Sequence, residues 1–295
     1  MDRGFGSVNK TKPDSTTYVR SWSDPERIQR FAYPRLINRS RPIAIYRMKP
    51  NPEGRLTGEP LSASGRLLLP PVSPINPKSI KRAFDDTRLD ASRFLRPWTA
   101  GRIGDVLRIV PKSCRGAVVD GLLSATGSGT VTMWCKPHRK FGDVARGLLV
   151  WRPSVHDRMA IGTDPLGYLW VVLGEGNDVA CLRSQRPMQL NHWTYVAIAW
   201  SDGRLQGVHA VDQLAPLEPT VTEPPSIVHP MRAADEGASS DGLATSELRI
   251  GLVTTDGEPW QVWVDEVAVF DRALPLASIN AFWQRFNEED AIRLR

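Results

Sequence analysis

The sequence predicts an all-β protein, an antiparallel β-sandwich with a short C-terminal helix, preceded by an extended N-terminal arm rich in proline and arginine. β-Branched and aromatic stretches of about 5–10 residues recur through the last two thirds of the chain. Turn-forming residues separate these stretches, and no helical period intervenes. The arm is predicted because 12 of the 24 prolines fall within the first 100 residues, where they interrupt strands and helices.

The predicted strands alternate in the way that a sheet with two packed faces requires. In residues 129–137, Val131, Met133 and Cys135 share one face. The strands are expected at 106–110, 129–137, 147–152, 159–162, 168–173, 179–184, 193–200, 204–211, 247–252 and 260–270. A helix is predicted after the last strand, because Ile279, Phe282 and Phe286 form an apolar stripe and Pro275 lies near its first turn. Strands that follow one another without intervening helices favour a sandwich over βαβ units.

The front of the chain differs from the rest in charge. The first 100 residues carry 19 Lys and Arg against 9 Asp and Glu, whereas the remaining residues carry 19 against 23. Short apolar pieces at 43–46 and 67–69 lie between the prolines, and a helix capped by Ser79 is the one regular element predicted in the arm. We expect residues 1–105 to be an arm that other subunits of the same assembly hold in place, since an extended backbone satisfies its polar groups on a neighbouring sheet or groove.

The composition bounds the partners and the compartment. The arginines of the arm are scattered and accompany no nucleic-acid-binding motif, so protein docking is favoured and nucleic acid is an unlikely partner. The chain has no apolar run long enough to span a membrane, and its start lacks a signal peptide. Its three cysteines, Cys114, Cys135 and Cys181, form no CxxC motif, which argues against a disulfide scaffold or a zinc site.

Four segments together resemble the laminin-G-like domain of the concanavalin A-like lectin and glucanase superfamily. Residues 129–137 (GTVTMWCKP) resemble one strand of that family, and residues 191–200 (NHWTYVAIAW) resemble another. Residues 248–251 (LRIG) occupy the place of a third, and residues 264–274 (VDEVAVFDRAL) are similar to the strand and helix start that close the domain. The resemblance covers about 106–286, implies a jelly-roll sandwich, and leaves residues 287–295 as a C-terminal tail.

The residues of this sequence indicate no enzymatic activity. Glucanases of the superfamily carry a Glu-x-Asp-x-x-Glu strand whose carboxylates share one face, and this sequence has no such triplet. Asp265 and Glu266 are adjacent, so strand alternation directs them to opposite faces. The five histidines show no metal-ligand spacing. We therefore expect no catalytic residues, while the fold by itself decides nothing about function.

Two kinds of ligand stay open. Members of the superfamily often hold a structural calcium ion, and the resemblance implies a site at Asp265 with backbone carbonyls at 113–116, including Gly116; alternatively, Asp265 hydrogen-bonds only to neighbouring backbone. Trp151, Trp170 and Trp260 are the candidate ligand-binding residues, because flat rings suit sugar faces, although core or interface packing is the alternative for each. Residues 216–241 are expected to be an insertion that adapts the surface to a partner.

The sequence predicts a non-enzymatic structural component of a large assembly. A bacteriophage virion protein (head decoration, neck, tail or short fibre) fits best, made in the host cytoplasm, oligomeric, and anchored through its arm while it displays the lectin-like domain. A carbohydrate-binding lectin used in attachment to the host surface is the first alternative. A scaffold subunit of an intracellular or organellar complex is the second.

Overall fold

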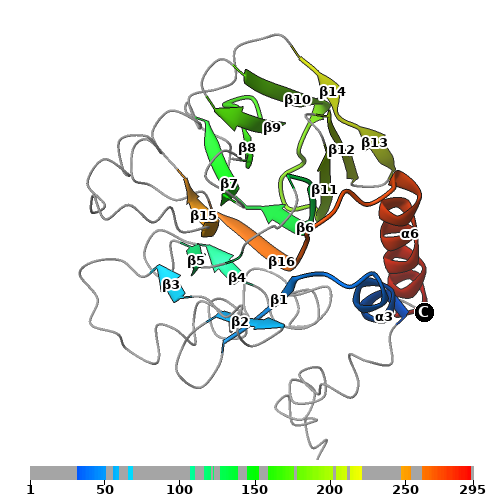
Figure 1. Cartoon of the computed structure of the whole chain (residues 1–295). Helices are drawn as coiled ribbons and strands as arrows, with labels where there is room; N and C mark the ends of the chain where they lie inside the picture. Colours follow the sequence, from blue (N-terminus) through cyan, green and yellow to red (C-terminus); the bar gives the residue numbers. More distant parts are fainter. Residues whose placement is uncertain are drawn as a thin grey trace, which may run out of the picture.

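The structure is a computed structural model in which a β-sandwich carries two helices on one outer face (Figure 1). The described residues are 32–50, 56–59, 66–68, 107–109, 116–120, 122, 127–138, 145–152, 159–175, 178–201, 204–210, 213–220, 247–253 and 261–293. None of the helices in these ranges is both long and apolar enough to cross a membrane.

Each layer of the sandwich is an eight-stranded antiparallel sheet. Sheet A has the order β13-β12-β11-β6-β16-β1-β2, and β4 also pairs with β16. Its strands are β1 (Ala44–Pro50), β2 (Leu56–Glu59), β4 (Leu107–Ile109), β6 (Gly129–Pro137), β11 (Thr194–Ser201), β12 (Arg204–Ala210), β13 (Leu214–Pro216) and β16 (Val262–Phe270). Sheet B has the order β14-β10-β9-β8-β7-β15-β5-β3. Its strands are β3 (Arg66–Leu68), β5 (Gly116–Asp120), β7 (Arg146–Arg152), β8 (Met159–Thr163), β9 (Tyr168–Glu175), β10 (Asp178–Pro187), β14 (Glu218–Pro219) and β15 (Glu247–Val253).

The predicted fold class is confirmed. All ten predicted strands are present with ends that shift by a few residues, and the predicted C-terminal helix is α6 (Leu276–Arg293). The sequence prediction missed a second helix, α3 (Ala32–Arg39), and six strands, because these are short or lie in the proline-rich front of the chain. The missed strands are β1, β2, β3, β5, β13 and β14. The helix expected to begin at Ser79 and the greater part of the insertion at 216–241 lie outside the described residues.

The main core lies between the two sheets. Alternate residues of each strand enter it: Leu169, Val171 and Leu173 from β9, and Val131 and Met133 from β6. Trp151 and Trp200 meet in its middle, with ring centroids 5.2 Å apart and an interplanar angle of 73°. Burial of side chains such as these drives the pairing of the sheets, at about 1.5–3 kcal/mol for each large apolar group.

Part of the predicted arm belongs to this sandwich. β1 pairs antiparallel with β16, with Ala44 opposite Val269 and Tyr46 opposite Val267. Ala44 and Tyr46 enter the core between the sheets, while Ile45 faces the other way and is also buried. Ala44, Ile45 and Tyr46 are therefore ordered by contacts within their own chain, while docking of the arm to other subunits stays a prediction. β2 and β3 extend the two sheets in the same way.

The outer face of sheet A is apolar and is covered by α3 and α6, which lie side by side at the right of Figure 1. Tyr33 of α3 and Phe286 of α6 meet edge to face at 5.2 Å. Phe286 also packs on Trp134 of β6 at 4.3 Å, and Phe282 stacks on Phe270 of β16. This second core joins the front of the chain to its C-terminal helix, and α6 runs across the boundary at 286/287 that the sequence predicted.

Backbone contacts fix the end of α3 against the turn after β16. Arg41 has a φ of 51°, in the left-handed region where helices commonly end, and Pro42 follows it. Ser40 and Arg41 follow directly after the last residue of α3. The guanidinium of Arg272 donates hydrogen bonds to their carbonyl oxygens. The amide of Ile43 then donates to the carbonyl of Val269 at 2.8 Å and begins the β1–β16 pairing. The helix end and the strand start are therefore set by the same turn.

A β-bulge changes the predicted geometry of the two acidic residues on β16. The register with β6 shifts between Asp265 and Ala268, and Glu266 has a φ of 48°. Regular alternation is therefore lost at this point, and the expectation that the two carboxylates point to opposite faces is wrong. Burial raises the pKa of Tyr33 well above its ordinary value, and the nearby Tyr195, Glu266 and Asp265 raise it further. Both acidic residues are at most 2% exposed.

His209 on β12 is buried in an apolar setting. Its register partner on β11 is Val196, which belongs to the core between the sheets. The side chain is 7% exposed, and neither ring nitrogen has a hydrogen-bond partner within the described part of the chain. Burial lowers the pKa of His209 below its ordinary value, because a charged imidazolium would lose its hydration there.

This histidine predicts loss of stability in mild acid. Above about pH 7 the ring is neutral in both the folded and unfolded states, so it adds no pH dependence. As the pH falls through about 6.5 the unfolded chain binds a proton that the folded chain resists, so the free energy of unfolding decreases. Urea denaturation between about pH 5 and 8 measures this decrease. In His209→Leu, the free energy of unfolding should decrease less over this pH range than it does in the unmodified chain. In the control His192→Gln, at an exposed histidine, it should decrease as much as in the unmodified chain. A decrease in His209→Leu equal to that of the unmodified chain would contradict the assignment.

Candidate functional site

The outer face of sheet B carries a row of apolar residues that ends in a polar cluster. Val150, Ala160, Val172 and Cys181 lie opposite one another on β7, β8, β9 and β10. All four are at most 9% exposed, and they face away from the core between the sheets. Burial raises the pKa of the Cys181 thiol, so this cysteine is an apolar packing residue. Cys135 and Cys181, the two cysteines within the described ranges, are free thiols.

The next row along the same face contains Trp170 and Arg183. The register pairs Arg183 of β10 with Trp170 of β9, then Trp170 with Gly162 of β8, and Gly162 with Gly147 of β7. Gly162 and Gly147 therefore continue this row across the sheet, on the side of Trp170 that lies away from Arg183. Tyr168 lies two residues before Trp170 on β9 and shares its face.

A hairpin turn places Asp164 at the end of these strands. The amide of Gly167 donates to the carbonyl of Asp164 at 2.9 Å, and Gly167 has a φ of 87°, which a residue without a side chain adopts readily. The Oδ1 of Asp164 accepts hydrogen bonds from the amides of Leu166 and Tyr168, each at 2.9 Å. Asp164 thus closes the turn and remains fixed with its second oxygen toward the sheet face.

The second oxygen of Asp164 joins the two long side chains. Its Oδ2 accepts hydrogen bonds from the Nε1 of Trp170 and from the guanidinium of Arg183, both at 3.1 Å. The guanidinium lies 3.7 Å from the ring centroid of Tyr168 and 5.6 Å from that of Trp170. We call Asp164, Tyr168, Trp170 and Arg183 the arginine–aromatic cluster. The side chain of Arg183 is 32% exposed and that of Asp164 is 13% exposed, so the arginine forms the solvent side of the cluster.

The cluster is arranged for binding through its arginine. A guanidinium carries five N–H donors in one plane, and here stacking on Tyr168 and the ion pair with Asp164 hold that plane in place. The donors that Asp164 does not use are available to hydroxyl, carbonyl or carboxylate oxygens of a ligand. Asp164 already accepts four hydrogen bonds, which fill its oxygens, so its role is to position Arg183. At the tip of the hairpin, Leu166 is 72% exposed.

The three tryptophans predicted from sequence have different positions. Trp170 lies in the arginine–aromatic cluster, although its ring is only 4% exposed and is covered by Arg183. Trp151 is fully buried in the core between the sheets, where its Nε1 donates to the carbonyl of Leu122 at 3.1 Å. Its ring faces are therefore occupied by protein. Trp260 lies outside the described residues.

Two of the residues predicted to bind calcium, Gly116 and Asp265, lie in different sheets, and positions 113–115 lie outside the described residues. Gly116 lies on β5 of sheet B, where it pairs with Gly251. Asp265 lies on β16 of sheet A and pairs with Trp134, whose ring packs against the helix layer on the far side of that sheet. The two positions are therefore separated by the thickness of the sandwich. Across the described ranges, no three His, Cys, Asp or Glu side chains are placed to hold a metal ion together.

Sequence reasoning missed Asp164, Tyr168 and Arg183. The turn Asp164–Gly167 was recognisable, and alternation on β9 places Tyr168 on the face of Trp170. The partner strand was also predicted, and the pairing of Arg183 with Trp170 continues the regular register in which Asp178 stands opposite Glu175; the register irregularity lies beyond it, between Arg183 and Pro187. What the prediction lacked was the residue-by-residue pairing of these two strands, which brings Arg183 beside Trp170.

The two antiparallel sheets form a jelly-roll sandwich with the concanavalin A-like fold. The receptor binding domain of botulinum neurotoxin D is similar in structure, with a TM-score of 0.51 and 11% identity over 84% of this chain and 53% of that domain. A Trypanosoma rangeli sialidase matches with a TM-score of 0.47 and 11% identity over 81% of this chain and 32% of the sialidase. Domain 4 of the Geobacillus stearothermophilus arabinanase AbnA, in complex with arabinotriose, matches with a TM-score of 0.42 and 16% identity over 62% of this chain and 78% of that domain.

The comparisons by sequence add no family. No protein-family model matches this chain, and no curated protein matches its sequence. The chain spans about one third of the sialidase and about half of the neurotoxin domain. At these identities the likeness shows the fold alone.

The arginine–aromatic cluster predicts a stability effect that distinguishes Asp164 from an ordinary surface carboxylate. Asp164→Ala removes four hydrogen bonds and leaves Trp170 Nε1 and Arg183 without this acceptor, so the free energy of unfolding should fall by about 1.5–3 kcal/mol. The matched control is Asp271→Ala, which breaks an exposed ion pair with Arg272 at 3.4 Å and should cost at most about 1 kcal/mol. Urea denaturation of both variants makes the comparison; equal losses would mean that Asp164 does not organise the cluster.

Proposed function

We propose that this chain is a carbohydrate-binding domain that recognises a sugar at the outer face of sheet B, around Arg183, and does not convert it chemically. The single observation that carries the proposal is the guanidinium held flat on Tyr168 by Asp164, with a third of its side chain open to solvent. Sugar recognition combines hydrogen bonds to hydroxyl groups with contacts to apolar ring faces, and Arg183 and Leu166 offer both kinds of group at one end of the sheet.

The fold comparison supports a binding role. The neurotoxin domain with the same fold is, by its description, a receptor-binding domain. A binding role also suits the chemistry of the cluster, since the carboxylate of Asp164 is occupied by four donors and is poorly placed to move a proton. We therefore keep the absence of catalysis as part of the proposal.

The assembly role is not favoured by the described residues. Its main argument was that the N-terminal arm is ordered by neighbouring subunits. β1 is instead paired with β16 of its own chain, and α3 packs on α6. A virion or scaffold protein stays a prediction of the sequence, and binding to a sugar would be compatible with attachment to a host surface.

A glycan array tests the proposal with the full chain. We expect binding to a defined subset of sugars, and Arg183→Ala should weaken it by at least about tenfold, or 1.4 kcal/mol. Arg204→Ala, at an exposed arginine on sheet A, and the core variant Trp151→Phe should keep the affinity of the unmodified chain. Thermal melts of each variant separate lost binding from lost folding.

Two results would overturn the proposal. One is an array on which the unmodified, folded chain binds no sugar. The other is a bound sugar whose affinity is the same for the unmodified chain and for folded Arg183→Ala. Incubation of a bound glycan with the protein, followed by mass spectrometry of the sugar, tests the expectation that it is released unchanged.

A further inference from the structure

A carboxylate stands beside Arg183 on the side that lies away from Trp170. Strand β14 pairs with β10, and the register places Glu218 directly opposite Arg183. The next pair in that register is Leu182 with Pro219, and Leu182 enters the core between the sheets. Because neighbouring residues of a strand alternate, Arg183 and Glu218 both face outward. Opposite side chains of an antiparallel pair start about 4.5–5.5 Å apart, so Glu218 borders the proposed sugar site.

Gln185 fixes the position of this carboxylate. It follows Arg183 by two residues on β10, and its side-chain amide donates a hydrogen bond to the Oε1 of Glu218. The side chains of Gln185 and Glu218 are both exposed. Within the described part of the chain this is the one hydrogen bond of the Glu218 side chain, and neither Arg183 nor Arg186 forms an ion pair with it. The Oε2 of Glu218 is therefore open to a ligand.

Arg183 thus lies between two carboxylates that differ in what they can do. Asp164 accepts four hydrogen bonds and is paired with the guanidinium, whereas Glu218 has acceptor capacity left. A hydroxyl group both donates and accepts, so adjacent hydroxyls of a sugar ring can accept from Arg183 and donate to Glu218. An ionised carboxylate only accepts. It would gain nothing from Glu218 and would place a like charge beside it.

We propose that Glu218 makes the site select neutral sugars over sugars that carry a carboxylate, with Arg183 donating to one hydroxyl group and Glu218 accepting from its neighbour. The inference rests on the proposed sugar site and specifies its ligand class, a neutral hexose unit with two adjacent free hydroxyl groups. Gln185 acts through Glu218 and is a positioning residue.

Matched pairs of sugars on an array test this selectivity with the full chain. The probes are disaccharides that end in glucose, galactose or mannose, each beside the disaccharide that ends in the corresponding hexuronic acid. We expect the chain to bind the neutral member of at least one pair about threefold to fivefold more tightly than its acidic partner in low salt, the range that exposed charges supply. The preference should shrink as salt is raised, because salt screens exposed charges.

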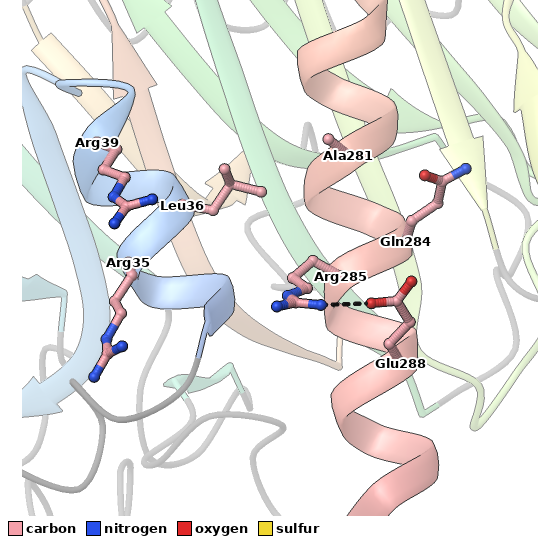
Figure 2. Close-up of a pocket in the computed structure, with 7 residues that line it drawn as sticks. All are labelled: Arg35, Leu36, Arg39, Ala281, Gln284, Arg285 and Glu288. Carbon is pink, nitrogen blue, oxygen red and sulfur yellow. Dashed lines mark hydrogen bonds and ion pairs between the residues drawn. The ribbon is translucent and has the colours of Figure 1, made fainter.

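The variant Glu218→Gln separates the charge of this side chain from its shape. The amide keeps the size of the side chain and an oxygen that can accept from Gln185, and the exposed position leaves folding unchanged. The two members of each bound pair should then differ by less than about twofold in affinity. The control Glu288→Gln removes an exposed carboxylate on α6, where Arg285 pairs with it at 2.8 Å (Figure 2). It should keep the preference of the unmodified chain.

The outcomes distinguish a failure of this inference from a failure of the sugar site itself. Acidic sugars that bind as tightly as neutral ones, or more tightly, and that are lost in Arg183→Ala would overturn the selectivity and leave the sugar site in place. A preference for neutral sugars that is unchanged in folded Glu218→Gln would do the same. A folded chain that binds no sugar, or whose binding is unchanged in Arg183→Ala, would overturn the proposed function and this inference with it.

Discussion

The interaction on which the rest of the structure depends is the burial of the apolar outer face of sheet A beneath α3 and α6. Trp134, Tyr195 and Phe270 project from that face and would lie in water without the helices. Tyr33 and Phe286 cover them from opposite ends of the chain. Because one layer of packing needs both helices, the front of the chain is a structural part of the sandwich.

The candidate site lies on the outer face of sheet B, on the opposite side of the sandwich from the two helices. There the ring of Tyr168 and the carboxylate of Asp164 hold the guanidinium of Arg183 in place.

The sequence predicted the architecture well because its signal is local. The alternation in β6 and the apolar stripe of α6 need no knowledge of their neighbours. The placement of β1 was missed because Pro42 and Pro50 bound a short apolar stretch, and this stretch forms a strand through pairing with β16 and burial of Ala44, Ile45 and Tyr46. The candidate site was predicted in part through Trp170. The turn that holds Asp164 could be predicted, but the hydrogen bonds that bring its carboxylate to Trp170 and Arg183 join residues 6 and 19 apart in the chain and were not predicted. The bulge at Glu266 was likewise not predicted.

Hydrogen exchange of the β1 amides in the dilute full chain tests the central claim most directly. Pairing with β16 and burial on both faces predict that the amides of residues 43–46 exchange as slowly as those of β16, at a rate independent of protein concentration. Protection of that kind requires the strand to be held by its own chain. Rapid exchange of these amides while β16 is protected, or protection that disappears on dilution, would show that the front of the chain is held by another molecule.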